Sequence, residues 1–296
     1  MVRSLSQIFR VKREEIDRLK DLLFRREDVI RLEASNKYEA FRAKYKDYVI
    51  IGYKTGKIVA TNEDAKKLML EILPKILLEH SKKIIIGSDE AGKGEWLGPI
   101  VVAAVALSQE QSYELQAQGV MDSKELTLPR IKALAEFIRN HNYMHAKLVI
   151  TPKRYNELYY ELRNEKETLN GILAWGHSRV IERLYKSLHK GFADVKVIID
   201  EFDRVKTRKR LRLVLDINKL EVIQQPRAEE FTAVAAASVI ARDIREEYIN
   251  FLCEKLHKDL RTLTVEYAIS DERVAEYAKV SYLKKLLSTK YKMAFR

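Results

Sequence analysis

A polar, glycine-rich segment at residues 87–99 constrains this chain more than any other feature. Three isoleucines at 84–86 precede it, and the wholly apolar run 100–107 follows it. Such runs are typical of buried strands, so two adjacent carboxylates, Asp89 and Glu90, are predicted where one strand ends. Acidic side chains beside a core are unfavourable unless a positive group meets them. A divalent metal is a common partner for such a pair.

Further acidic residues follow two other elements. Asp200 closes the mostly apolar run 195–199, where it could cap the next element or bind a metal. Glu229 and Glu230 precede an alanine-rich helix, where one of them is expected only to stabilise the helix dipole. Carboxylates that converge from separate strand ends repel one another. The pattern therefore predicts two Mg²⁺ or Mn²⁺ ions, because such ions prefer oxygen ligands and can activate water in pairs.

The charge balance indicates a polyanionic partner. The chain of 296 residues carries 55 Lys and Arg against 43 Asp and Glu, a net charge of +12. This excess favours nucleic acid; a merely soluble basic surface is the alternative. No apolar run reaches membrane-spanning length, and no feature indicates a protein partner, so a monomer is expected.

The single cysteine, Cys253, excludes an intramolecular disulfide and a multi-cysteine metal site. We expect it to be a core residue. The first residues lack the apolar stretch of a signal peptide. A cytoplasmic protein is therefore expected.

Residues 1–80 are predicted to form a small α+β domain. Helical spacing at 14–24 is followed by period-two patterns at 29–32, 38–45, 47–53 and 58–60. Thr61 or Asn62 can cap a second helix, which Pro74 is expected to kink or break. Helices on one face leave the other face of the sheet open. Aromatic and basic side chains there either suit a sugar-phosphate backbone or are simply solvated: Tyr38, Arg42, Lys44, Tyr53, Lys54 and Lys57.

Residues 84–296, beyond a polar linker at 79–83, are predicted to form an α/β layered domain with a mixed sheet. We expect strands at 83–88, 100–107, 146–150, 195–200 and 220–223. Helices are expected at 129–140, 152–163, 168–190, 231–259 and 271–287. Ligands of such sheets bind at strand ends, which makes Asp89 and Asp200 natural site residues.

Three other features have two interpretations each. Residues 92–94 (Gly-Lys-Gly) lack the spacing of a P-loop. Their glycines either let the backbone approach a ligand, with Lys93 on a phosphate, or form a tight turn. His177 is expected to make a structural hydrogen bond. The basic run 204–212 either neutralises phosphates or is a solvated face.

Four motifs resemble those of type 2 ribonucleases H, in that family's order. Residues 89–106 (Asp-Glu-Ala-Gly-Lys-Gly, then Leu-Gly-Pro and a Val/Ala strand) resemble its opening motif. Residues 121–126 resemble its Asp-Ser-Lys motif, and Val-Ile-Ile-Asp at 197–200 resembles its third acidic site. Residues 227–242 resemble its Lys-Ala-Asp/Glu…Ala-Ala-Ser-Ile-Ala-Lys segment. The resemblance covers 84–260, and the stretch after Arg261 is left unassigned.

Ribonuclease HIII is the more similar branch. Glu95 stands where HII-like chains usually have proline, and residues 170–177 are similar to the HIII version of that helix. The last third has no Gly-Tyr-Gly stretch, which HII enzymes carry. The resemblance implies a ribonuclease H-like fold preceded by a TATA-binding-protein-like domain that holds the hybrid.

The resemblance also implies a function: an endonuclease that cuts the RNA strand of RNA/DNA hybrids and leaves 5′-phosphate and 3′-hydroxyl ends. The alternatives are cleavage at single ribonucleotides in DNA, as in ribonuclease HII, and a nucleic-acid-binding protein without catalysis. The implied metal ligands are Asp89, Glu90, Asp200 and Glu229, with Asp89 bridging the ions. Glu230 is the alternative fourth carboxylate, and Asp203 is an outside candidate.

Substrate contacts are implied at two further places. Gly92, Lys93 and Gly94 would contact the ribose 2′-hydroxyls, the groups that separate RNA from DNA. Lys124 would lie near the nucleic-acid backbone.

Overall fold

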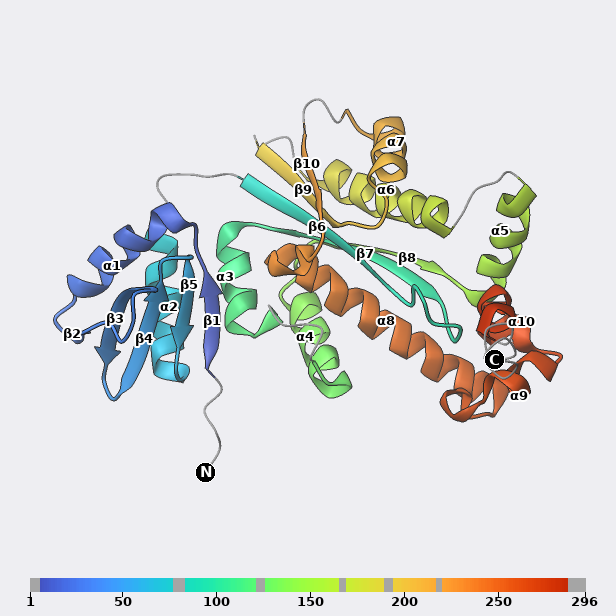
Figure 1. The fold of residues 1–296 in the computed structure, drawn as a ribbon, viewed down its shortest axis with the longest axis horizontal. Helices are drawn as coiled ribbons and strands as arrows, with labels where there is room; N and C mark the ends of the chain where they lie inside the picture. Colours follow the sequence, from blue (N-terminus) through green and yellow to red (C-terminus); the bar gives the residue numbers. More distant parts are fainter. Residues whose placement is uncertain are drawn as a thin grey trace, which may run out of the picture.

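Two five-stranded sheets, with helix α3 (Gln109–Ala117) between them, organise the chain (Figure 1). The computed structural model describes residues 6–76, 83–120, 126–164, 169–188, 194–216 and 220–286. Within these ranges, no helix combines the length and the apolar composition that crossing a membrane requires.

The N-terminal sheet is antiparallel throughout, in the order β1-β5-β4-β3-β2. Its strands are β1 (Gln7–Arg10), β2 (Val29–Leu32), β3 (Glu39–Tyr45), β4 (Tyr48–Tyr53) and β5 (Lys57–Ala60). Helices α1 (Ile16–Phe24) and α2 (Glu63–Ile76) pack on one face, where alternate strand residues such as Phe41 and Ile50 are buried. The predicted α+β unit is confirmed. Strand β1 was not predicted; it pairs with β5, which follows it by about 50 residues, and a local pattern does not show such pairing.

Helix α2 begins as its cap predicts. The Asn62 side-chain oxygen accepts a hydrogen bond from the Ala65 backbone N–H at 2.8 Å. The helix runs through Pro74 to Ile76, so a break before Pro74 is not found. Residues 77–82, which hold most of the predicted linker, lie outside the described ranges.

The second sheet is mixed, in the order β10-β9-β6-β7-β8. Its strands are β6 (Lys83–Ala91), β7 (Ile100–Leu107), β8 (His145–Ile150), β9 (Asp194–Asp200) and β10 (Glu221–Gln225). Strand β6 is parallel to β9 and antiparallel to β7. The predicted α/β class is confirmed, with one correction. Asp89 and Glu90 lie inside β6, because they still pair with Ala103 and Val102 of β7.

Helices cover both faces of this sheet, so the domain has three layers (Figure 1). One face carries α3, α4 (Leu128–Asn140) and α8 (Thr232–Leu256). The other carries α5 (Pro152–Asn164), α6 (Leu169–Ser187) and α7 (Arg204–Val214). Helix α3 was not predicted. The basic run 204–212 is helix α7, which buries Thr207 and Leu211.

Helix α8 lies unusually close to the sheet at Gly87. A Cβ added to Gly87 would lie 2.2 Å from the Ala233 backbone carbon. No side chain fits in that distance, so glycine on β6 and alanines on α8 together permit the contact.

The C-terminal part contradicts the single helix predicted at 271–287. Helix α9 (Val265–Ser270) ends before it, and α10 (Val274–Tyr277) is four residues long. The chain then straightens at Ala278, which forms an isolated antiparallel bridge with Leu97. Helix resumes over 280–286. Cys253 is partly buried against this region.

Helix α3 joins the two units. Its Tyr113 and Ala117 complete the core of the N-terminal unit. The Arg10 backbone N–H donates to the Gln116 side-chain oxygen at 2.8 Å, and the Gln116 amide donates to the Thr232 hydroxyl at 2.8 Å. The core of the first unit therefore includes residues of a helix that follows this unit in the sequence. The predicted division into 1–80 and 84–296 stays a prediction.

We expect Gly87→Ala to lower the free energy of unfolding by about 1–3 kcal/mol, because α8 must move off the sheet. Gly176→Ala is the control. A Cβ there meets side-chain atoms and no backbone among its three nearest neighbours, Val102 Cγ2 at 3.0 Å and Leu148 Cδ2 at 3.4 Å first, and alanine improves helix propensity. Urea unfolding of both variants measures the difference. A loss for Gly87→Ala no larger than for the control would contradict the close packing.

Candidate active site

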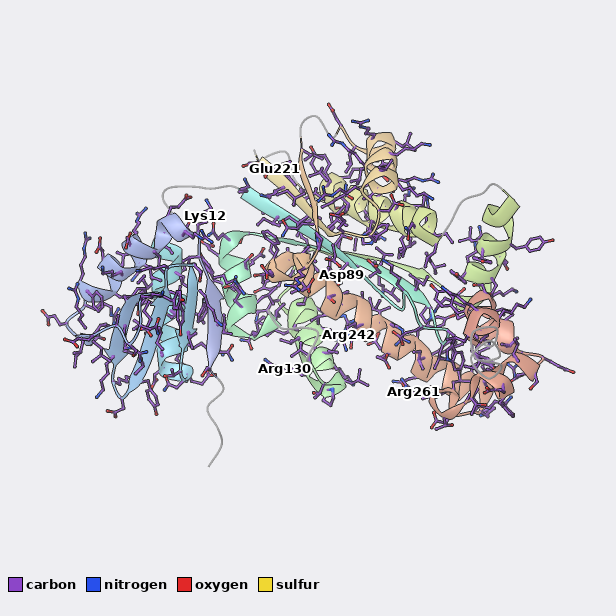
Figure 2. All side chains as sticks on the ribbon, in the orientation of Figure 1. Lys12, Asp89, Arg130, Glu221, Arg242 and Arg261 are labelled. Atoms are coloured by element: carbon purple, nitrogen blue, oxygen red, sulfur yellow. The ribbon has the colours of Figure 1, made fainter. Side chains whose placement is uncertain are left out.

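A cleft of about 640 Å³ lies where β6 and β9 end. Four carboxylates from separate parts of the chain line it: Asp89, Glu90, Asp200 and Glu229. Figure 2 shows Asp89 near the middle of the molecule, with Arg242 of α8 beside it. The structure thus brings every predicted metal ligand to one cleft.

Asp89 is held in an unfavourable electrostatic environment. Burial, the charge of Glu90 and, more weakly, that of Asp200 raise the pKa of Asp89 well above its usual range. A hydrogen bond with Ser238 of α8 acts in the opposite direction. Because burial and the neighbouring negative charges both disfavour the ionised form of Asp89, a bound cation would stabilise that form.

Glu90 is anchored by the protein itself. His177, which is fully buried, donates from Nε2 to Glu90 Oε2 at 3.0 Å, and Lys93 Nζ lies 3.2 Å from Oε1. The other ring nitrogen of His177 lies 2.7 Å from the Ser88 hydroxyl. Burial alone would raise the pKa of Glu90, but these two partners outweigh it and lower that pKa. The hydrogen bond expected of His177 is present, and its partner is a site carboxylate.

Asp200 and the two glutamates are positioned by a short turn. The Asp200 carboxylate accepts a hydrogen bond from the Ala228 backbone N–H at 3.1 Å. Ala228 opens the 3₁₀ turn η3 (Ala228–Glu230). Glu229 lines the cleft, whereas Glu230 is exposed and lines a different cavity.

Asp203 caps a helix and is not part of the carboxylate cleft. Its side chain accepts a hydrogen bond from the Lys206 backbone N–H at 3.0 Å and caps helix α7. The Asn170 amide donates to its second oxygen at 3.4 Å. Asp203 does not line the cleft.

The cleft suits a hard cation. Its acidic donors are all carboxylates, the chemistry that Mg²⁺ and Mn²⁺ prefer. No His or Cys lines it in the described ranges, and His177 Nε2 is engaged with Glu90. The side chains stand apart: among described residues, no three acidic, His or Cys groups are gathered closely enough to hold an ion as placed.

Gly92 and Lys93 of the Gly-Lys-Gly turn line the cleft, and Gly94 lines two other cavities. Gly92 has φ of +86°, and a Cβ there would lie 2.2 Å from the Pro99 carbonyl oxygen. Gly94 has φ of +107°, and a Cβ there would meet no described heavy atom within 4 Å. The turn therefore requires glycine at both positions, and it leaves the backbone of Gly94 open to a ligand.

Comparison with known proteins agrees with this geometry. A family model described as Ribonuclease HII matches residues 86–295. The chain belongs to the ribonuclease HII family. This match extends beyond Arg261, into the stretch that the sequence motifs left unassigned.

Curated relatives place the chain nearer one branch of the family. It is 37% identical over 236 residues to Ribonuclease HIII of Protochlamydia amoebophila, covering 76% of this chain and 73% of the relative. It is 33% identical over 229 residues to Ribonuclease HIII of Chlamydia pneumoniae, covering 74% of each. The predicted resemblance to ribonuclease HIII is confirmed.

Solved structures share the fold. The crystal structure of Bst-RNase HIII in complex with Mn²⁺ superposes with a TM-score of 0.62 at 25% identity, covering 96% of this chain and 99% of that one. Aquifex aeolicus RNase H3 superposes with a TM-score of 0.54 at 22% identity. The chain is a metal-dependent ribonuclease H, which acts on RNA/DNA hybrids with Mg²⁺ or Mn²⁺.

In this ribonuclease, the C-terminal segment clamps the glycine-rich turn. Lys279 donates from its backbone N–H to the Trp96 carbonyl and from Nζ to the Gly98 carbonyl, each at 2.7 Å. The Gly98 N–H donates to the Tyr277 carbonyl at 2.8 Å. Lys279 is fully buried. Trp96 and Gly98, just before strand β7, are thus held by a segment about 180 residues later.

Arg245 of α8 holds the same turn from the other side. Its guanidinium donates to the Leu97 carbonyl at 3.2 Å and pairs with Glu95 and Glu246. Sequence reasoning assigned no role to Arg245, Lys279 or Ser238. A lysine or arginine in a basic chain gives no sign that it will be buried, so the pattern alone could not single them out.

The residues predicted to contact nucleic acid fall into three groups. Lys93 lies at the cleft, with Nζ 5.0 Å from the Phe202 ring centroid. Tyr53, Lys54 and Lys57 lie at the ends of β4 and β5 and the turn between them. Lys124 lies outside the described residues.

We expect Lys279→Met to lower kcat for hybrid cleavage on the order of tenfold, the range found when a supporting residue is lost. The side chain keeps its length but cannot hold the Gly98 carbonyl. Lys284→Met, at an exposed position of the same segment, is the control. Steady-state kinetics below the unfolding temperature measure both. Parent-like kcat in Lys279→Met would contradict the clamp.

The effect of Lys279→Met on stability should depend on pH. Burial and, next, the charge of Arg245 lower the pKa of Lys279 to about 7. Between this value and the ordinary pKa of 10.5, the unfolded chain binds more protons than the folded chain. Stability of the parent relative to Lys279→Met should therefore rise as the pH increases from 7 to 10. Thermal unfolding across this range checks the sign.

Proposed function

We propose that Asp89, Glu90, Asp200 and Glu229 would hold two Mg²⁺ or Mn²⁺ ions. The enzyme then cuts the RNA strand endonucleolytically, with water as the nucleophile, and leaves 5′-phosphate and 3′-hydroxyl ends. The observation that carries the proposal is that these four carboxylates, from separate parts of the chain, line one cleft. When bound, such ions activate water and stabilise the leaving oxygen.

The surrounding residues keep the carboxylates in place. His177 holds Glu90, and the Ala228 N–H holds Asp200. Ser238 restrains Asp89 from helix α8. These hydrogen bonds orient the three carboxylates towards one cleft before an ion binds. The free energy needed to arrange the ligands on binding is therefore smaller. Glu229 is preferred over Glu230 as the fourth ligand because it lines that cleft.

Strand choice is assigned to the Gly-Lys-Gly turn. A Cβ at Gly94 would meet no described heavy atom within 4 Å, and the left-handed conformation of Gly92 turns the chain beside the cleft. Peptide groups so placed can hydrogen-bond ribose 2′-hydroxyls, which DNA lacks. In the described structure the Lys93 ammonium pairs with Glu90. We assign it to a substrate phosphate once ions neutralise that carboxylate. Lys124 is assigned to the backbone by its motif alone.

The open face of the N-terminal sheet is assigned to hybrid binding, as in a TATA-binding-protein-like domain. Helices α1 and α2 cover only its other face. Arg42 and Lys44 of β3 alternate with buried residues and lie on this open face, with Tyr53 and Lys57 at neighbouring strand ends. Arg42 is held there by a two-point contact with Glu39, at 2.7 and 3.0 Å. We further infer a cytoplasmic monomer.

Cleavage at single ribonucleotides is the second candidate, because the matching family model carries the HII name. A uniform hybrid and a DNA duplex with one ribonucleotide, each tested with Mg²⁺ and with Mn²⁺, distinguish the two. Preference for the uniform hybrid is expected.

We expect Asp89→Asn to lower hybrid cleavage by more than about 100-fold while hybrid binding persists. Residues that merely support a metal ligand already account for about 10- to 100-fold. Asp203→Asn is the matched control, because asparagine also caps a helix and Asp203 does not line the cleft. Single-turnover cleavage and binding titrations measure both variants. Full activity in Asp89→Asn would refute the metal assignment.

We expect Lys54→Gln with Lys57→Gln to weaken hybrid binding and to reduce the slope of log affinity against log salt by about 2, roughly one per phosphate contact. Lys67→Gln, an exposed position on α2 at the opposite face, should change neither. Titrations at several salt concentrations measure this. Equal slopes in all three proteins would assign the open face another role.

A further inference from the structure

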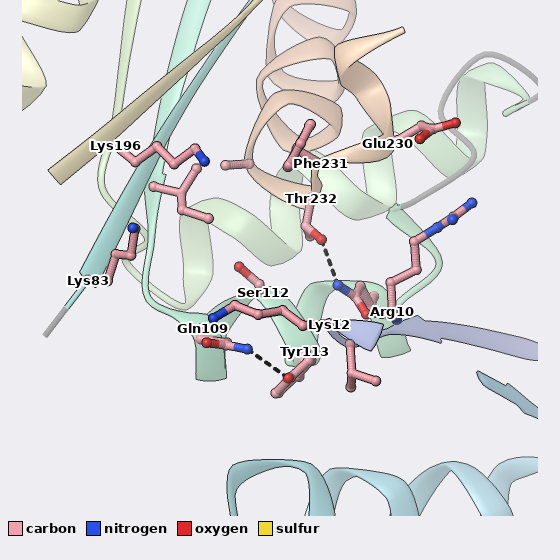
Figure 3. Close-up of a pocket in the computed structure, with 14 residues that line it drawn as sticks. Arg10, Lys12, Lys83, Gln109, Ser112, Tyr113, Lys196, Glu230, Phe231 and Thr232 are labelled. Carbon is pink, nitrogen blue, oxygen red and sulfur yellow. Dashed lines mark hydrogen bonds between the residues drawn. The ribbon is translucent and has the colours of Figure 1, made fainter. Parts of the chain in front are cut away.

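A second cavity lies between the two units, at the other end of strand β6. It has a volume of about 460 Å³. Strand β1 and the following loop form one wall, helix α3 the floor, and the starts of β6, β9 and α8 the opposite wall (Figure 3). Lys83 precedes Asp89 by six residues, which corresponds to about 20 Å along a strand. The cavity is therefore separate from the carboxylate cleft.

Four cationic side chains line this cavity, two from each unit. Arg10 and Lys12 come from the N-terminal unit, and Lys83 and Lys196 come from the second sheet. In Figure 3 the ammonium groups of Lys12, Lys83 and Lys196 lie on the same side of the cavity, above Gln109. Register explains part of this convergence, because Lys196 pairs with Ile85, two residues from Lys83.

Acidic neighbours compensate these cations only in part. Lys83 lies 3.2 Å from Asp194 and 3.6 Å from Glu221, and Lys196 lies 2.8 Å from Glu221. Two carboxylates thus serve two ammonium groups at the edge of the cavity, while Lys12 and Arg10 add further positive charge. Lys12 has Glu14 as its neighbour, at 3.7 Å and largely exposed to solvent. Such a pair contributes little. Glu230 also lines the cavity, so the lining holds four cationic side chains against one carboxylate and carries an excess of positive charge.

The interior of the cavity is apolar. Ile85, Tyr113 and Phe231 line it behind the charged groups, and Tyr113 is almost fully buried. A cavity with an apolar interior and a few charged groups on one side matches ligands that have a ring and an anionic end. A nucleic-acid duplex is too wide to enter this cavity. Its phosphates would reach only the charged side chains at the opening.

We propose that this cavity binds a small phosphorylated ligand of mononucleotide size, with its phosphates on Lys12, Lys83 and Lys196 and its ring against Ile85 and Phe231. The ligand contacts both units, so its binding links their relative position to ligand concentration. Glu230, adjacent to the proposed metal ligand Glu229, lines the same cavity. The proposal is independent of the function assigned to the carboxylate cleft.

Calorimetric titration of the full chain with ADP tests the proposal. The buffer contains EDTA, so that phosphates cannot bind through metal at the carboxylates. We expect saturable binding of ADP, weaker binding of pyrophosphate and none of adenosine. Lys12→Gln and Lys196→Gln should each weaken ADP binding about tenfold, the effect of losing one charge-assisted hydrogen bond. Lys147→Gln, at an exposed position of β8, should bind like the parent.

Two controls distinguish loss of ADP binding at this cavity from damage to the active site and from misfolding of the variant. Lys12→Gln removes no buried contact and should keep parent-like hybrid cleavage with Mg²⁺. Bound ADP should also raise the melting temperature of the parent more than that of Lys12→Gln. Absence of saturable binding, or equal affinity in the parent and Lys12→Gln, would overturn the proposal. Displacement of ADP by an RNA/DNA hybrid would also overturn it, because the cations would then belong to the nucleic-acid path.

Discussion

Repulsion between Asp89 and its neighbours is the constraint on which the rest of this structure depends. Two consecutive carboxylates inside a strand, with a third from β9 nearby, cost free energy wherever water is excluded. The protein stabilises the ionised form of one carboxylate more than that of the other. Glu90 receives the buried His177 and the Lys93 ammonium, and its pKa falls. Asp89 has a hydrogen bond with Ser238, but burial and the charges of Glu90 and Asp200 outweigh it, and its pKa rises. The site is therefore most stable when a cation enters.

Close packing of α8 on β6 makes this arrangement possible. Gly87 and Ala233 let the helix approach the sheet at its start, and the same helix then presents Ser238 to Asp89 and Arg245 to the glycine-rich turn. A bulkier residue at Gly87 would move all of these groups together. Packing and chemistry are thus coupled through a single helix.

The distal parts of the chain act on the same centre through different contacts. The C-terminal segment holds the turn that is assigned to RNA recognition, chiefly through the buried Lys279. The N-terminal unit is attached through α3, whose Tyr113 completes its core. That attachment leaves a cationic cavity between the units. Binding there and cutting at the cleft are separated by the length of one strand.

Local pattern was enough for much of the fold and for the candidate ligands. Strand β7 and the other strands of the second sheet follow from apolar runs, and Asp89, Glu90 and Asp200 stand out because acidic residues follow such runs. Pattern could not show that β6 continues through Asp89 and Glu90, because the reason is pairing with β7, a non-local hydrogen-bond ladder.

Only the tertiary structure determines which role each acidic residue has. Asp203 caps α7, Glu229 lines the cleft and Glu230 lines the other cavity, although all three look alike in the sequence. The buried Lys279 and His177 likewise acquire their partners from segments about 180 and 90 residues away. Residue type specifies which chemistry is available. Long-range packing decides which groups meet, because distance along the chain carries no information about distance in space.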